Sequence, residues 1–163
     1  MANILITGCP GVGKSTVASL VADKTGLFLI NVGDVVKAER LYEEWDDELQ
    51  TFILDEPALI SYLEPKIEER GVIVDFHSPA VFSSDWFDLV VVLTCINDIL
   101  YPRLEQRGYS EAKIQDNIEA EIMEVVLDEA MDIFEDKVVR FPCETLDQVD
   151  DIVNYICSFV NRT

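Results

Sequence analysis

The sequence predicts a single-domain α/β fold in which the strands of a sheet alternate with helices. Short runs of branched apolar residues alternate along the chain with stretches that carry apolar residues at helical spacing. The chain has 163 residues, 49% of them hydrophobic, which suffices for one domain with a real core. No internal repeat and no linker rich in Gly, Ser or Pro divides it. We therefore expect residues 1–163 to form one domain.

Five apolar runs predict the strands. They are Asn3–Thr7, Leu27–Asn31, Val72–Asp75, Leu89–Leu93 and Val138–Phe141. Continuous apolar runs of this length are typical of strands that are buried on both faces of a parallel sheet.

Capping and stop signals predict the helices between these strands. The first helix follows Ser15 and stops near Gly26, and Asp34, Asp55 and Asn97 are the expected N-caps of the next three. The later spans are 34–41, 55–71 with a kink or break at Pro65, 97–106 with a break at Pro102, 110–133 and 146–160. The acidic stretch Glu43–Glu48 is interpreted as a solvated loop or helix end, although it could also receive a basic partner.

Residues 8–15 carry the most informative motif. They read Gly-Cys-Pro-Gly-Val-Gly-Lys-Ser and match G-x-x-x-x-G-K-S, the phosphate-binding loop of nucleoside-triphosphate enzymes. A strand precedes the motif and a helix follows it, as this loop requires. Backbone N–H groups and the helix N-terminus can cradle phosphate, Lys14 can reach the β- and γ-phosphates, and Ser15 can ligate Mg²⁺. The alternative is a glycine-rich turn with an unrelated lysine.

A second acidic element follows the third predicted strand. Val72–Asp75 is an apolar run that ends in a carboxylate, the pattern of a Walker B strand, so Asp75 is expected near Ser15 and the metal. His77, the one histidine, should share the face of Asp75 if the strand continues. Asp75 could instead cap a helix. His77 could orient a water near the γ-phosphate, or be a loop residue with a locally bonded ring.

Cations are few, with 12 Lys and Arg residues in all, so their positions are informative. Arg103 and Arg107 stand four residues apart on one predicted helix face, where a polyphosphate would relieve their repulsion. Ion pairs with neighbouring acids are the alternative. Lys37 and Arg40 follow the second strand, where a second nucleotide could dock, although a solvated helix face also explains them.

Composition excludes several classes of protein. The net charge of −20 disfavours binding to free nucleic acid or to an anionic membrane, so a nucleic-acid role would pass through a basic protein partner. The four cysteines form no C-x-x-C pair and indicate reduced thiols. No signal peptide or membrane span is recognisable, and we expect an intracellular protein. The chain lacks the N-K-x-D tetrapeptide of GTPases and is too small for a motor ATPase. The class that remains after these exclusions is a small kinase that uses ATP.

The sequence resembles the adenylate kinase isoenzyme 6 family over essentially its whole length. The resemblance is carried by the phosphate-binding loop and by the segments Ile30–Asp34, Ile53–Glu56, Gly71–His77, Asp85–Phe87, Leu100–Tyr101, Arg103–Glu105, Arg107–Tyr109 and Asp116–Ile118. The Asp-aromatic-His strand end and the Arg-Gly-Tyr segment are specific to the family.

This resemblance implies a nucleoside-monophosphate-kinase fold with a five-stranded parallel sheet, a monophosphate-binding region at 31–54 and a short lid at 106–116. Its implied ATP contacts are Gly11, Val12, Gly13, Lys14, Ser15, Thr16 and Arg107, and its implied acceptor contacts are Gly33, Asp34, Lys37 and Arg40. Lys14, His77, Arg103 and Arg107 would serve catalysis, and Ser15 and Asp75 would hold Mg²⁺.

The resemblance further implies ATP:AMP phosphotransfer with ATPase activity, in the cytoplasm and nucleus. The alternative is an ATP-driven assembly factor that contacts a basic ribosomal protein during small-subunit maturation. A kinase for another small metabolite is a third hypothesis. The chain departs from the family pattern at Lys37 and Thr94, where arginine is usual, and at Pro102.

Overall fold

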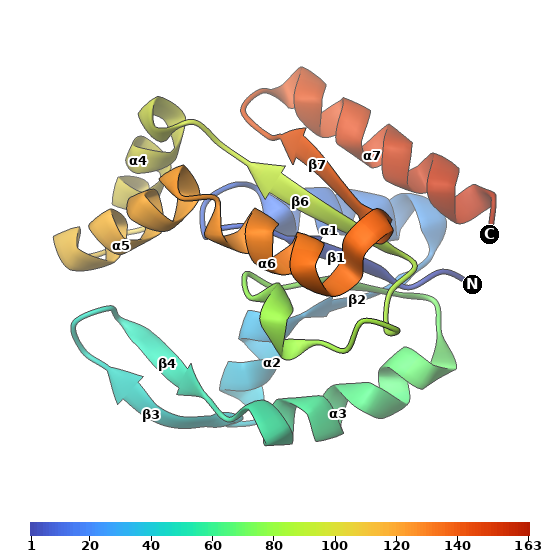
Figure 1. Ribbon diagram of the computed structural model, residues 1–163, viewed down its shortest axis with the longest axis horizontal. Coiled ribbons are helices and arrows are strands. Elements are labelled where there is room, and N and C mark those ends of the chain that lie inside the picture. Colours follow the sequence, from blue (N-terminus) through green and yellow to red (C-terminus); the bar gives the residue numbers. More distant parts are fainter.

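The computed structural model describes residues 1–163 and contains a five-stranded parallel sheet between two layers of helices (Figure 1). The strand order is β2-β5-β1-β6-β7, and every neighbouring pair is parallel. The strands are β1 (Ile4–Thr7), β2 (Phe28–Asn31), β5 (Val72–Asp75), β6 (Leu89–Thr94) and β7 (Val138–Pro142). All five predicted strands are confirmed, and so is the α/β class.

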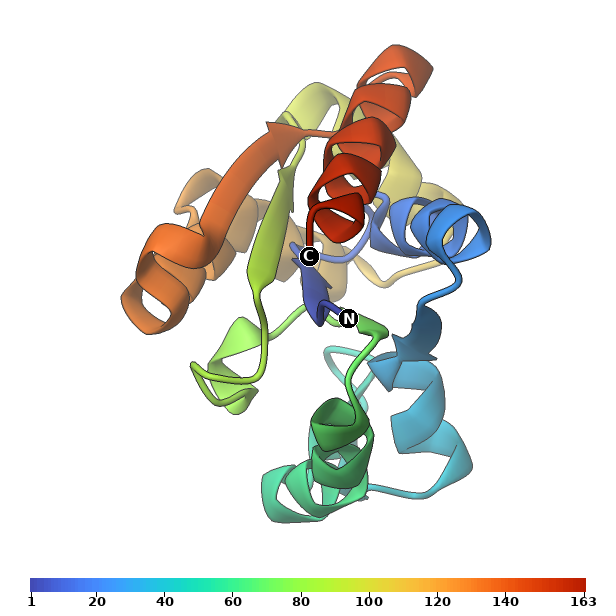
Figure 2. The ribbon, with the colours of Figure 1, turned by 90° about the vertical axis from the view of Figure 1, so that its right-hand side faces the viewer.

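A separate hydrophobic core covers each face of the sheet. On one face, β1, β5 and β6 pack against α1 (Lys14–Thr25), α4 (Asn97–Gln106) and α7 (Leu146–Asn161). On the other face, the same strands pack against α2 (Val32–Ala38), α3 (Glu56–Glu69) and α6 (Val125–Phe134). Figure 2 shows α7 and α6 on opposite sides of the sheet. Burial on both faces explains why the central strands β1, β5 and β6 are apolar without alternation. No helix is long and apolar enough to cross a membrane.

Two of the predicted helix caps are wrong. Asn31, not Asp34, caps α2, because its side chain accepts the N–H of Asp34 at 3.0 Å. The cap of α4 is Ile96, without a side-chain hydrogen bond, so Asn97 is already inside that helix. Asp55 caps α3 as predicted and accepts the N–H of Ala58 at 3.2 Å.

The predicted breaks also differ from the structure. Neither Pro65 nor Pro102 splits its helix. The pattern at 110–133 is instead divided into α5 (Glu111–Ile122) and α6 by Glu124, whose φ of 54° is left-handed. Ile114 of α5 belongs to one core and α6 belongs to the other. A straight helix could not bury both apolar faces, so the chain turns between them.

The acidic stretch Glu43–Glu48 is neither a plain loop nor a helix end. It supplies most of β3 (Tyr42–Asp46), which pairs antiparallel with β4 (Thr51–Leu54) as a separate hairpin (Figure 1). The Phe52 ring stacks on Tyr42 with centroids 4.1 Å apart and meets Trp45 edge-on at 4.9 Å. Cross-strand aromatic pairs therefore stabilise the hairpin. Its acidic residues kept the two strands from being recognised in the sequence.

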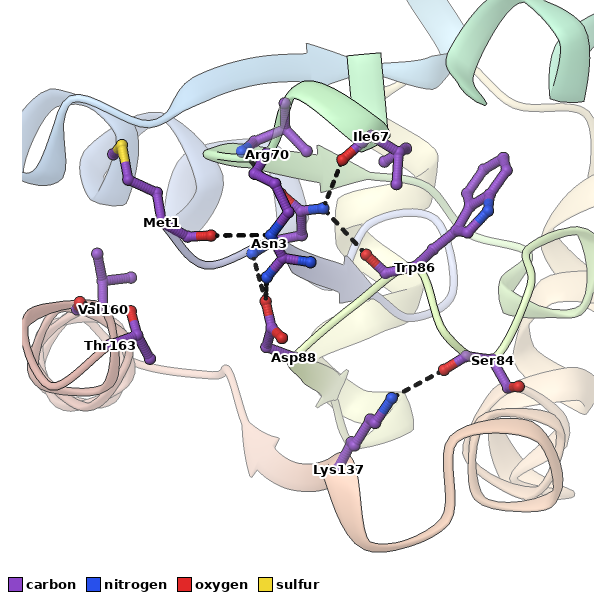
Figure 3. Close-up of polar contacts among 11 residues, drawn as sticks. Met1, Asn3, Ile67, Arg70, Ser84, Trp86, Asp88, Lys137, Val160 and Thr163 are labelled. Carbon is purple, nitrogen blue, oxygen red and sulfur yellow. Dashed lines mark hydrogen bonds and ion pairs between the residues drawn. The ribbon is translucent and has the colours of Figure 1, made fainter. Parts of the chain in front are cut away.

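The end of the sheet near the N-terminus is held by a polar network around the buried Asn3 (Figure 3). Its amide nitrogen donates to the carbonyls of Ile67 at 2.9 Å and Trp86 at 3.1 Å. Its backbone N–H donates to Asp88 at 2.8 Å, and Asp88 also pairs with Arg70. Buried polar groups are nearly always hydrogen-bonded, and Asn3 has such partners. The network around Asn3 therefore stabilises the fold at this end of the sheet.

The short 3-10 helices η1 (Pro79–Val81) and η2 (Glu135–Lys137) complete the fold. A capping box at Thr145 and Gln148 starts α7, which reaches Asn161, close to the predicted end.

Candidate active site

The phosphate-binding loop joins the end of β1 to α1 at the carboxyl edge of the sheet. Gly13 begins the helix with φ of 109°, a left-handed conformation that favours glycine. A Cβ at Gly13 would also lie 3.0 Å from the Cys143 sulfur. The loop therefore needs glycine here for both conformation and space, and the N-terminus of α1 faces the site.

Lys14 lies folded back over its own loop. Its Nζ donates to the carbonyl oxygens of Gly8 and Cys9, both at 3.0 Å. Desolvation lowers the pKa of Lys14 to about 8, the nearby Asp75 raises it, and Arg107 lowers it further. A bound polyphosphate would supply the negative charge that these carbonyls only partly replace.

Ser15 and Asp75 are brought together although they are 60 residues apart in sequence. The Ser15 hydroxyl donates to Asp75 Oδ2 at 2.8 Å, and the carboxylate is only 4% exposed. No helix begins directly after Asp75, since η1 starts at Pro79 with Ser78 as its cap. The alternative of Asp75 as a helix cap is therefore wrong.

The oxygen atoms of this pair fit a magnesium ion. Mg²⁺ usually binds one or two protein oxygens and completes its shell with water and substrate phosphates. The structure holds no cluster of three or more His, Cys, Asp or Glu residues that would form a closed protein site. Ser15 and Asp75 would supply two such protein oxygens.

β5 ends at Asp75, and His77 lies beyond it. The alternation of side chains along a strand therefore does not determine which way His77 points. The exposed ring packs edge-on against Phe76, with centroids 4.5 Å apart, and makes no hydrogen bond to the protein. The alternative of a locally bonded ring is therefore wrong. Although His77 is exposed, desolvation by the protein around the ring lowers its pKa, and the charges of Lys14 and Lys113 lower it further. The imidazole is therefore neutral at physiological pH.

Arg103 and Arg107 occupy different environments despite their shared helix face. Arg103 lies beneath the phosphate-binding loop and donates to the carbonyls of Gly11 at 3.2 Å, Val12 at 3.4 Å and Cys143 at 3.1 Å. Arg107 is exposed, and the one hydrogen bond of its side chain goes to the Tyr109 hydroxyl at 3.3 Å. The ion pairs of the structure, Arg70–Asp88 and Arg140–Glu124, include neither residue. Ordinary ion pairing therefore does not explain them.

Four cavities meet around these side chains. The loop cavity, of about 480 Å³, lies between the phosphate-binding loop and the start of α7, and its lining includes Gly11, Val12, Gly13, Thr16, Arg103 and Arg107. The central cavity, of about 160 Å³, is lined among others by Lys14, Ser15, Asn31, Asp75, His77 and Arg107. The hairpin cavity, of about 300 Å³, includes Gly33, Lys37, Thr51, Phe52, Phe76, His77 and Val81. The lid cavity, of about 510 Å³, includes Lys37, Trp45, His77, Tyr109, Lys113 and Asp116.

The residues expected to bind an acceptor are only partly brought together. Gly33 and Lys37 line the hairpin cavity. Asp34 lines a different groove, along the edge strand β2, and Arg40 lines none of these cavities. The predicted monophosphate-binding region spans 31–54, but neither Asn31 nor hairpin residues such as Phe52 were among the predicted site residues. The aromatic spacing of the hairpin was the available signal.

The hairpin also contacts the predicted lid directly. Gln50 Oε1 accepts the backbone N–H of Ser110 at 2.7 Å, and the backbone carbonyl of Gln50 accepts from Lys113 Nζ at 3.0 Å. The Ser110 hydroxyl donates to the Glu48 carbonyl at 3.2 Å. These contacts close one wall of the lid cavity.

The parallel sheet, the loop and the acidic strand end define a P-loop nucleotide-binding fold. A profile of the AAA domain family matches residues 4–124. Among solved structures, shikimate kinase from Bacteroides thetaiotaomicron superposes with a TM-score of 0.66 at 17% identity, covering 98% of each chain. A gluconokinase from Sinorhizobium meliloti 1021 gives 0.57 at 16% identity, covering 99% of this chain and 92% of that one. These identities show the fold alone.

Sequence relatives are more specific. The adenylate kinase isoenzyme 6 homolog of Schizosaccharomyces pombe is 44% identical over 161 residues, covering 98% of this chain and 92% of that protein. The homolog of Caenorhabditis elegans is 40% identical, with coverage of 98% and 90%, and that of Plasmodium falciparum is 36% identical, with coverage of 97% for both. The chain belongs to the adenylate kinase isoenzyme 6 family.

Proposed function

We propose that the protein transfers the γ-phosphate of ATP to a nucleoside monophosphate, with AMP as acceptor and Mg²⁺ as cofactor. The observation that carries this proposal is the position of His77. Its side chain lines the central cavity with Lys14 and Asp75, and it lines the hairpin cavity with Lys37 and Phe52. A phosphate at Lys14 and an acceptor beside Lys37 would therefore meet, as in-line transfer requires.

The donor nucleotide would lie along the phosphate-binding loop. Backbone N–H groups at the start of α1 would receive its phosphates, and Lys14 would leave the loop carbonyls to contact them. The loop cavity beyond Arg107 has room for the nucleoside part. Arg107 has no acidic partner, so its charge is available to the transferring phosphoryl group.

Ser15 and Asp75 would hold the magnesium ion. When bound, Mg²⁺ neutralises charge that develops on the phosphate oxygens. The neutral imidazole of His77 can accept or donate a hydrogen bond at the junction of the cavities. It would orient either the acceptor oxygen or, without an acceptor, a water molecule, and the second case would give an accompanying ATPase activity.

The acceptor would enter the hairpin cavity. Phe52 and Phe76 offer apolar surface to a base, and Lys37 supplies the charge for a monophosphate. Lysine binds phosphate as a point charge without the bidentate geometry of arginine, so we expect acceptor binding to be modest.

The test is an assay of ATP with AMP, GMP, CMP and UMP in turn, in which nucleoside diphosphate is separated from free phosphate. We expect the AMP reaction to form ADP faster than any other monophosphate forms its diphosphate. Free phosphate as the sole product with all four acceptors would contradict the kinase proposal. Faster use of another monophosphate would contradict AMP as the acceptor.

The net charge of −20 favours a second candidate, an ATP-driven contact with a basic protein of the small ribosomal subunit. In that case ATP and ADP states of the protein would bind such a partner with different affinity. Equal affinity in both states, measured at physiological salt, would contradict this role.

A further inference from the structure

Asn31 lies at the point where the metal-side carboxylate meets the acceptor-side helix. It is the last residue of β2, and the parallel register sets it beside Asp75, the last residue of β5. Its side chain lines the central cavity. Neither the loop motif nor the acidic strand end includes this residue.

The two ends of the Asn31 amide have different partners. Oδ1 accepts the backbone N–H of Asp34 at 3.0 Å and so caps α2. Nδ2 donates to Asp75 Oδ2 at 2.9 Å and lies 3.3 Å from the Ser15 hydroxyl. The orientation of the amide is fixed by these partners, because a helix N–H needs an acceptor and a carboxylate needs a donor.

A helix cap alone does not explain asparagine at this position. Serine and aspartate cap helices about as well as asparagine does, and threonine somewhat less well. Of these residues, only asparagine has an acceptor and an N–H donor on separate atoms, so it can cap the helix with one and donate to a neighbouring carboxylate with the other. Asp75 is 4% exposed, so protein donors replace most of the water that would otherwise solvate it.

We propose that Asn31 is a positioning residue for the magnesium site, which holds the Asp75 carboxylate toward Ser15 and ties that carboxylate to the start of α2. The inference rests on the proposed function, since it assumes that Ser15 and Asp75 serve a nucleotide-bound ion. Groups that orient metal ligands through hydrogen bonds typically contribute about 10–100-fold to metal affinity. Asn31 has that relation to Asp75.

The test uses Asn31→Thr, with Asn31→Ser as a second variant, because both keep a cap acceptor and lose the amide donor. Asp55→Ala is the matched control, since it removes the cap of α3, and Asp55 neither lines the central cavity nor bonds to Ser15 or Asp75. Calorimetry measures binding of a non-hydrolysable ATP analogue with and without Mg²⁺. Thermal unfolding of each variant measures how much stability the change at the helix cap costs.

We expect Mg²⁺ to tighten analogue binding to the wild type and to the Asp55→Ala control equally. In both Asn31 variants the Mg²⁺ concentration for half-maximal tightening should rise about tenfold or more, with metal-free affinity changed less than about twofold. An unchanged Mg²⁺ midpoint in a folded Asn31 variant would overturn the inference and leave a helix cap. Absence of Mg²⁺-dependent tightening in the wild type would overturn the proposed magnesium site itself, and the inference with it.

Discussion

Arg103 donates a hydrogen bond from Nη1 to the carbonyl oxygen of Gly11 at 3.2 Å and so supports the phosphate-binding loop from below. Arg107, one turn later, is exposed and bonds only to Tyr109. Two arginines that the sequence groups as candidate phosphate ligands therefore have different hydrogen-bond partners. Arg103 shapes the loop, and Arg107 is free to contact a ligand.

This difference predicts that one alanine variant loses stability and the other loses activity. Arg103→Ala should lower stability by about 2 kcal/mol, or roughly 4–8 °C in Tm, because it leaves three carbonyls without their donor. Arg107→Ala should keep the wild-type Tm and lose about 10²-fold in kcat/KM for ATP. Thermal unfolding and kinetics are measured on both proteins. Loss of stability in Arg107→Ala with intact kinetics would contradict the assignment of Arg107 to ligand binding.

Asp75→Asn should damage the response to magnesium more than the fold. The amide keeps the shape and can still accept from Ser15, but it lacks the charge that binds the ion. A magnesium titration at saturating ATP should show a midpoint raised about tenfold or more and a lower maximal rate. If midpoint and rate both match the wild type, Asp75 has no metal role.

His77→Ala distinguishes two roles of the imidazole. If the ring positions a hydrolytic water, ATPase turnover should fall more than AMP phosphorylation, because AMP brings its own nucleophile. If it organises the magnesium shell, both rates should fall together. Both activities are assayed in parallel in wild type and variant. Equal rates for the two proteins would reject both roles.

The pH profile gives an independent check on His77. Its pKa in the folded protein lies below the reference of about 6.5, so the neutral form persists as pH falls through that value. The wild-type rate should therefore show no step near pH 6.5 that the variant lacks. A step there, absent from His77→Ala, would show that the ring titrates normally.

Glu121, in the last turn of α5, predicts a pH effect on stability. Its Oε2 is buried without a hydrogen-bond partner, and desolvation raises its pKa to about 7. Because this pKa lies above the unfolded value, the contribution of Glu121 to stability is present at low pH and is lost as pH rises through about 7. Glu121→Gln, which cannot ionise, should raise Tm at pH 8 by roughly 2–4 °C and change it little at pH 5. An equal shift at both pH values would contradict a buried ionisation.

The carboxyl edge of the sheet was largely predictable from sequence, because its signals are local. The loop motif fixes Lys14 and Ser15 within a few residues of one strand. The rule that ligands bind at the carboxyl ends of parallel strands then brings Asp75 to Ser15 across 60 residues.

The features that the sequence did not predict depend on contacts between residues far apart in the chain, which no local sequence pattern indicates. The role of Asn31 requires the register between β2 and β5. The hairpin was missed because Glu43–Glu48 reads as solvated, whereas the aromatic pairs of Phe52 across the strands stabilise it. The turn at Glu124 follows from two cores on opposite faces of the sheet, which only the folded chain reveals.

The most direct test of the central claim follows the labelled γ-phosphate of ATP in the presence of AMP. The account predicts that label appears in ADP formed from AMP in the wild type. It also predicts that folded Lys14→Met, which lacks the Nζ of the phosphate-binding loop, loses about 10²–10³-fold of this transfer. Label found only in free phosphate, or near-normal transfer by folded Lys14→Met, would contradict it.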